Sequence, residues 1–74
     1  MTRTILDPNL LTWEVYASGG PSDQPNIVFN CLSNRMIRPR YVRTEGDEAD
    51  AERIVSEASN EQLQEMLSKS TEVN

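Results

Sequence analysis

Alternating apolar and polar residues predict two strands in the first half of the chain. The first covers residues 12–18 (TWEVYAS) and the second covers residues 26–33 (NIVFNCLS). Between them, residues 19–25 (GGPSDQP) have the glycines and prolines of a turn. Because side chains alternate across a strand, we expect one apolar face composed of Trp13, Val15, Ala17, Ile27, Phe29 and Cys31.

A third strand is predicted from about Met36 to Thr44, after a tight connection at residues 33–35. Pro39 lies inside this segment and cannot donate a backbone hydrogen bond. The strand therefore either lies at the sheet edge or begins after the proline. Its side chains divide into two faces, one with Arg38, Arg40 and Val42 and the other with Ile37, Tyr41 and Arg43.

Past Gly46 the spacing of apolar residues changes from two to between three and four, which predicts helices. Asp47 is a suitable N-cap with Asp50 three residues later, and acidic side chains favour the positive end of a helix dipole. Ser59 and Gln62 have the spacing of a capping box, which predicts the start of a second helix. The apolar positions of the two helices are Ala51, Ile54, Val55, Ala58, Leu63, Met66 and Leu67.

Strands followed by helices predict an α+β domain: a small three-stranded antiparallel meander followed by two C-terminal helices packed on one face, in the order βββαα. We divide one small domain, residues 1–74, into an N-terminal turn or arm (1–11), the antiparallel sheet (12–44), a helical segment (47–70) and a frayed tail (71–74). Asp7 and Pro8 favour a short helical turn within the arm. So short a chain buries only a thin core, which favours further burial against a partner.

Composition argues against an enzyme. The chain has no histidine, so it cannot form a Ser-His or Cys-His nucleophile system by itself. It has no glycine-rich phosphate-binding motif. Its one cysteine, Cys31, lies on the predicted apolar face, where a small buried core residue is expected. The acidic run at residues 45–52 lacks the spacing of a calcium loop and suits a helix start. We therefore expect no enzymatic activity, no cofactor and no metal site.

Hydropathy also argues against a membrane protein. No apolar stretch approaches the roughly 20 residues of a membrane span. Asp7 and Pro8 interrupt the apolar residues near the N-terminus before a signal-peptide core is reached. We expect a soluble cytoplasmic protein.

Charge is distributed unevenly along the chain. Residues 1–43 contain five arginines and three carboxylates, a net charge of +2, whereas residues 44–74 contain two basic residues and nine carboxylates, a net charge of −7. Four of the arginines fall within residues 34–43 (NRMIRPRYVR). A segment of this kind requires an explanation in terms of a partner or of neutralising neighbours.

The leading hypothesis is a protein–protein interaction module, either self-associating as a homodimer or binding a protein partner. If the face bearing Trp13 packs on the helices, we expect the opposite face to show Glu14, Tyr16, Val28, Asn30, Leu32, Arg38, Arg40 and Val42. Tyrosine and arginine among aliphatic residues are typical of protein interfaces, although arginine stems also cover apolar surface with their heads in water. The contact surface would be this face or an edge strand at residues 37–44. The candidate binding residues are Tyr16, Arg35, Arg38, Arg40, Tyr41 and Arg43.

The alternative hypothesis is single-stranded nucleic-acid binding, with tyrosines stacking on bases and arginines contacting phosphates. The acidic net charge disfavours it, because nucleic-acid-binding domains usually have a pI above roughly 9. If the helix that begins near Asp47 lies against the arginine strand, Glu45, Glu48 or Glu52 would also neutralise the arginines.

Overall fold

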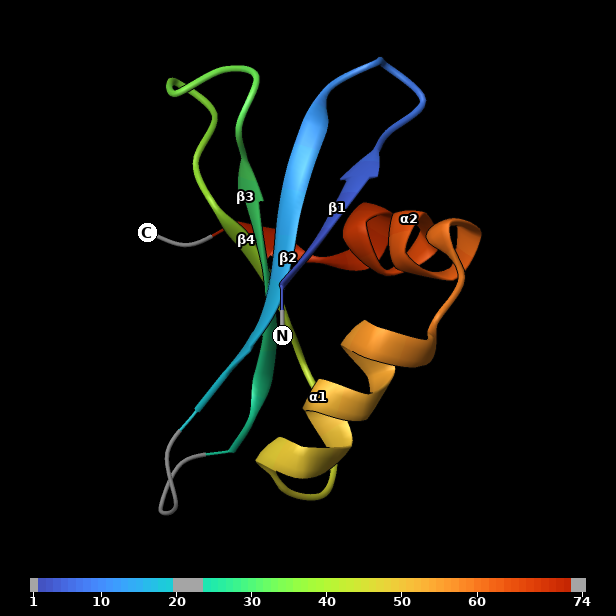
Figure 1. The fold of residues 1–74 in the computed structure, drawn as a ribbon. Coiled ribbons are helices and arrows are strands. Elements are labelled where there is room, and N and C mark those ends of the chain that lie inside the picture. The colour runs from blue at the N-terminus through green and yellow to red at the C-terminus, as the bar shows by residue number, and fades with distance from the viewer. Residues whose placement is uncertain (1, 20–23, 73–74) are drawn as a thin grey trace.

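The computed structural model describes residues 2–19 and 24–72, which form a five-stranded antiparallel sheet with two helices on one face (Figure 1). The strand order is β1-β2-β3-β4-β5, and the two helices form the connection between β4 and β5. The α+β class with an antiparallel sheet and two helices is confirmed, whereas the three-stranded meander is wrong. Residues 20–23 of the predicted turn lie outside the described residues. The elements are β1 (Thr2–Leu6), β2 (Thr12–Ser18), β3 (Asn26–Cys31), β4 (Arg40–Arg43), α1 (Glu48–Glu57), α2 (Asn60–Lys69) and β5 (Thr71–Glu72).

The two additional strands lie at the outer edges of the sheet. β1 occupies part of the expected N-terminal arm and pairs with the whole of Thr12–Tyr16 in β2. The alternation of buried and exposed residues in β1 is hard to recognise in the sequence, because Ile5 is the one buried residue of the strand. β5 has only two residues and pairs with Arg40 and Tyr41 of β4. It occupies two residues of the expected frayed tail; residues 73–74 lie outside the described part of the chain.

β4 begins directly after Pro39, which confirms one of the two alternatives for this segment. It is not the edge strand that we expected at residues 37–44, because β3 flanks it on one side and β5 on the other. Its register pairs Phe29 with Arg40 and Ile27 with Val42. Arg40 and Val42 therefore lie on the same face as the buried core, which is the opposite of our expectation.

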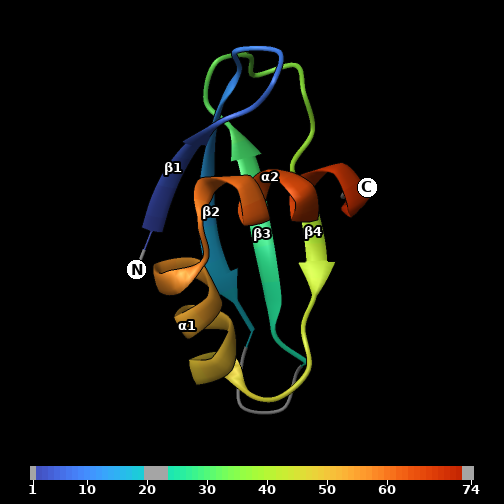
Figure 2. The ribbon, with the colours of Figure 1, turned by 90° about the vertical axis from the view of Figure 1, so that its right-hand side faces the viewer.

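The helices start where the sequence predicts. Asp47 accepts a hydrogen bond from the backbone of Asp50, and Ser59 accepts one from that of Gln62, and both sites are complete capping boxes. Helix α1 packs on β1, β2 and β3, and α2 packs on β1 and β4 (Figure 2). The buried apolar core consists of Ile5, Trp13, Val15, Ile27, Phe29, Cys31, Ala51, Val55, Leu63 and Leu67.

Candidate interaction face

The face of the sheet that the helices leave uncovered, which we call the open face, has a central row of Tyr16, Val28 and Tyr41. The register aligns Tyr16 with Val28 and Val28 with Tyr41, and exposed Thr2 and Thr71 continue the row at the two edges. The three central side chains are half-buried. Along their strands they alternate with residues on the helix-covered face, so they point away from the helices. Neither tyrosine hydroxyl has a hydrogen-bond partner within the described residues.

Two opposite charges flank this row. Glu14 lies beside Asn30 of β3, and Arg43 lies beside Asn26 of the same strand. Asn26 and Asn30 are two residues from Val28 in opposite directions. The open face therefore has one carboxylate and one guanidinium on opposite sides of a central valine.

The polar groups of the open face are incompletely paired within the chain. The carboxylate of Glu14 has no hydrogen bond or ion pair among the described residues. Arg43 Nη1 donates one long hydrogen bond of 3.5 Å to Gln24 Oε1. Asn26 Oδ1 is buried and accepts no hydrogen bond. The polar groups of the open face are thus less completely hydrogen-bonded than those of the helix-covered face. An unpaired buried acceptor costs about 1–3 kcal/mol.

Arg40 lies on the helix-covered face of the sheet, where its side chain makes hydrogen bonds within the chain. Its Nε donates to Ser70 Oγ at 2.7 Å, and its Nη2 donates to the Ser70 backbone oxygen at 2.5 Å. Ser70 is the C-cap of α2. The carboxyl end of a helix has unpaired carbonyls and partial negative charge, so a guanidinium stabilises it. Arg40 is therefore a structural residue and is removed from the candidate surface.

Arg3 has the equivalent role at α1, and sequence reasoning did not identify it. Its Nη1 donates to the carbonyls of Val55, at 3.1 Å, and Ala58. Its Nη2 donates to Asn60 Oδ1 at 2.8 Å, at the start of the next helix. The only available signal was its alternation with Ile5, which places both side chains on the helix side.

Arg35 and Arg38 lie in the connection between β3 and β4, away from the central row. Arg38 Nε is 3.7 Å from Glu72 Oε1, and both side chains are largely exposed. Within the described residues, the carboxylate that pairs with Arg38 thus comes from β5 and not from the start of α1. Of the six candidate residues, the sheet brings Tyr16, Tyr41 and Arg43 onto one face, and the other three lie elsewhere.

One end of the sheet exposes several apolar side chains. The β1–β2 and β3–β4 connections both lie at this end (Figure 1). Leu10 is 76% exposed and has a φ of 66°, a left-handed conformation that costs a leucine about 1–2 kcal/mol. The large apolar residues that are exposed in residues 2–19 and 24–72 are Leu6, Leu10, Leu32 and Met36.

The buried carboxylate of Asp7 holds the β1–β2 connection in place. Its Oδ1 accepts from the backbone of Asn9 at 2.8 Å and of Leu11 at 2.9 Å, and its Oδ2 accepts from Trp13 Nε1 at 2.9 Å. Desolvation alone would raise the pKa of Asp7, but the hydrogen bonds from Leu11, Trp13 and Asn9 lower it below the ordinary value of 3.8. The carboxylate therefore serves the fold in its ionised form.

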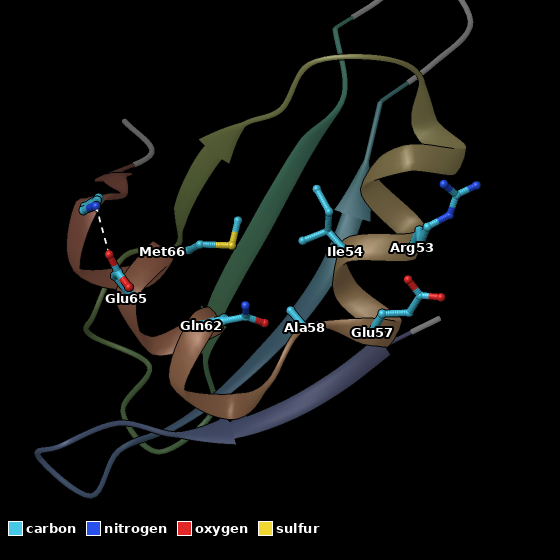
Figure 3. Close-up of a pocket in the computed structure, with 8 residues that line it drawn as sticks. Arg53, Ile54, Glu57, Ala58, Gln62, Glu65 and Met66 are labelled. Carbon is cyan, nitrogen blue, oxygen red and sulfur yellow. Dashed lines mark hydrogen bonds and ion pairs between the residues drawn. The ribbon is translucent and has the colours of Figure 1, made fainter.

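A second surface feature is an open groove of about 500 Å³ between the two helices. Ile54 and Met66 point into this space from α1 and α2, with Ala58 near the joint of the helices (Figure 3). Glu65 pairs with Lys69 along its wall at 3.1 Å. The groove carries both signs of charge beside these apolar side chains, so it indicates no particular ligand.

The rest of the surface offers no metal site or membrane span within residues 2–19 and 24–72. No group of three or more histidine, cysteine, aspartate or glutamate side chains is positioned to hold a metal ion in that part of the chain. None of its helices is long and apolar enough to cross a bilayer. Cys31 is buried at 5% exposure, which confirms it as a core residue. Comparison of the chain with protein-family models, curated proteins and solved structures gives no match.

Proposed function

We propose that this chain is a protein-interaction module that binds through the open face, with Tyr16, Val28 and Tyr41 at the centre of the contact. The observation that carries the proposal is the position of two tyrosines on either side of a valine on a sheet face that neither α1 nor α2 covers. Tyrosine combines a large apolar ring with a polar hydroxyl, which is why it is enriched at protein interfaces.

The size of the core supports the same proposal. Ten apolar residues among residues 2–19 and 24–72 are buried, contributed by one face of the sheet and one stripe of each helix. A domain of this size buries a small share of its surface, so binding that covers the open face would add to its stability.

Single-stranded nucleic-acid binding has less support. The two tyrosines are suitable for stacking, but Arg43 is the one arginine of residues 34–43 that shares their face. Glu14 on the same face offsets its charge. Phosphate binding depends on several cations acting together, and Arg40 is engaged by Ser70.

The proposal can be tested by affinity capture from an extract of the source cells with three baits. The wild-type chain is compared with Val28→Arg, which places a charge at the centre of the open face, and with Leu10→Arg, the same charge at the exposed end loop. We expect proteins bound by the wild type to be retained by Leu10→Arg and lost by Val28→Arg. Identical capture by Val28→Arg and the wild type would contradict the proposal.

The nucleic-acid alternative has its own measurement. Fluorescence anisotropy of a labelled mixed-sequence single strand at low salt should show no binding by the wild-type chain. Binding that is lost in Arg43→Ala and weakened steeply by salt would instead favour the alternative.

A further inference from the structure

We infer that the partner that fits the open face is a second copy of this chain, with Glu14 of each copy paired to Arg43 of the other. This inference rests on the proposed function, since it names the occupant of the same face. It is carried by the positions of the two charges relative to Val28.

The register fixes those positions. Glu14 is beside Asn30 and Arg43 is beside Asn26, so each charge is one strand and two residues away from Val28, in opposite directions. With strands about 4.8 Å apart and about 3.4 Å per residue, each charge is about 8 Å from Val28. The two charges therefore lie at equal distances on opposite sides of the valine.

This arrangement is self-complementary. In a two-fold symmetric dimer, residue i of one copy contacts residue j of the other, and j contacts i. Such an axis can lie in the plane of the interface, pass over Val28 and be perpendicular to the line joining Glu14 and Arg43. Rotation about it places Glu14 of each copy over Arg43 of the other. The resulting dimer has two identical ion pairs and a central contact between the two valines, with no like charges opposed.

The same axis also places the tyrosines. On the spacing above, Tyr16 of one copy comes over Asn26 of the other, and Tyr41 comes over Asn30. Each phenol hydroxyl, which has no partner within the described residues, then meets a side-chain amide. The strands of the two copies cross at about 70°, which is nearer to orthogonal than to aligned sheet packing.

Overall charge permits this contact even though the chain has a net charge of −5. Many of the carboxylates belong to the two helices, on the opposite side of the sheet from the open face. Face-to-face association points both helical layers outward, so their charges are separated by more than the screening length of about 8 Å at physiological salt. The helical carboxylates are Glu48, Asp50, Glu52, Glu57, Glu61 and Glu65.

The area of the open face predicts a weak dimer. Four strand spacings of about 4.8 Å and five or six residues of about 3.4 Å give roughly 400 Å² from each copy. Interfaces below about 1,200 Å² in total belong to weak or transient complexes. The dissociation constant should therefore be micromolar or weaker, and association must be measured up to about 1 mM.

The test is sedimentation equilibrium of four forms of the chain: the wild type, Glu14→Arg, Arg43→Glu, and the double variant with both changes. Each single reversal opposes two pairs of like charges, so we expect dimer affinity to fall about tenfold or more. The double variant recreates both pairs with the signs exchanged, and its affinity should return to within about threefold of the wild type. Circular dichroism of each variant is measured to check that it is folded.

Glu57→Arg and Arg53→Glu are the matched controls, because they make the same changes of charge on α1, away from the open face. They should leave the dimer affinity unchanged. A double variant as weak as the single reversals, or controls that weaken the dimer as much, would overturn the pairing of Glu14 with Arg43.

A strictly monomeric wild-type chain at 1 mM would overturn the second copy as the occupant. The proposed function would then still stand if Val28→Arg abolished capture of other proteins, and it would fail separately if Val28→Arg had no effect on any association.

Discussion

The two faces of the sheet are made by the same strands but differ in how their polar groups are used. On the covered face, Arg3 and Arg40 donate to backbone carbonyls at the carboxyl ends of the two helices. On the open face, Arg43 makes one long hydrogen bond and Glu14 has no partner within the described chain. Arg40 and Arg43 are three residues apart in one strand, so sequence neighbourhood alone does not assign the role of an arginine.

Arg3 and Arg40 are half-buried and support the helices that cover the core. Both buried-side arginines lie over helix ends, where carbonyls that lack intrahelical partners accept their hydrogen bonds. Neither α1 nor α2 ends on the open face, so it offers no such acceptors to Glu14 and Arg43. Three experiments test this difference between the faces.

The largest effect on stability is the difference expected between truncations of two neighbouring residues of β3 whose side chains point to opposite faces of the sheet. Phe29 is fully buried, so Phe29→Ala should lower the free energy of unfolding by about 3–5 kcal/mol. Val28→Ala on the open face should lower it by less than about 1 kcal/mol. Urea denaturation at a concentration where the chain is monomeric measures both. Equal losses would mean that the open face is as well packed as the core.

A smaller effect is expected at Asp7, which connects the end loop to Trp13 of the covered face. Asp7→Ala leaves three donors without their acceptor and should cost about 1–3 kcal/mol. Because its pKa is lower in the folded than in the unfolded chain, its contribution is present above about pH 4 and is lost as the pH falls through the folded-state pKa.

Urea midpoints of the wild type and Asp7→Asn between pH 2.5 and 6 measure this dependence. The wild type should lose more stability than Asp7→Asn over the acidic part of the range. Glu14→Gln, which removes a carboxylate from the open face, is measured beside them as the control for the loss of one charge. Parallel profiles for the wild type and Asp7→Asn would show that the Asp7 carboxylate does not contribute as an ion.

The smallest effect separates the two arginines of β4. Arg40→Met removes both hydrogen bonds to Ser70 but keeps an apolar stem, and it should cost about 1–2 kcal/mol. Arg43→Met should change stability by no more than about 0.5 kcal/mol. Thermal unfolding of the two variants side by side is sufficient. A larger loss at Arg43 than at Arg40 would reverse the roles assigned to them.

Much of the fold could be predicted because its signals are local. The capping boxes at Asp47 and Ser59 are each formed by residues three positions apart, so both helix starts were predicted correctly. The alternation in β2 and β3 identified the buried face of each strand. β1 and β5 were missed because neither has an apolar pattern long enough to recognise, and each is held by pairing with a strand already in the sheet.

The candidate site was predicted only in part, for a related reason. Alternation correctly grouped Arg40 with Val42 and Tyr41 with Arg43, since it depends only on the strand itself. It did not say which group faces the helices, because each contains one arginine and one apolar or aromatic residue. Pairing of Phe29 with Arg40, together with the acceptors of Ser70, decided this.

The sequence by itself determined the class of the fold, the helix starts and the inward alternation of the central strands, because these depend on residues within a few positions of each other. The tertiary structure decided the number of strands, which side chains of β4 face the helices, and how the arginines of residues 34–43 are divided among different parts of the surface. Those features depend on strand register and on helix ends more than ten residues away. They turned a segment that resembles one basic patch into a structural arginine, two loop arginines and one cation on an open face.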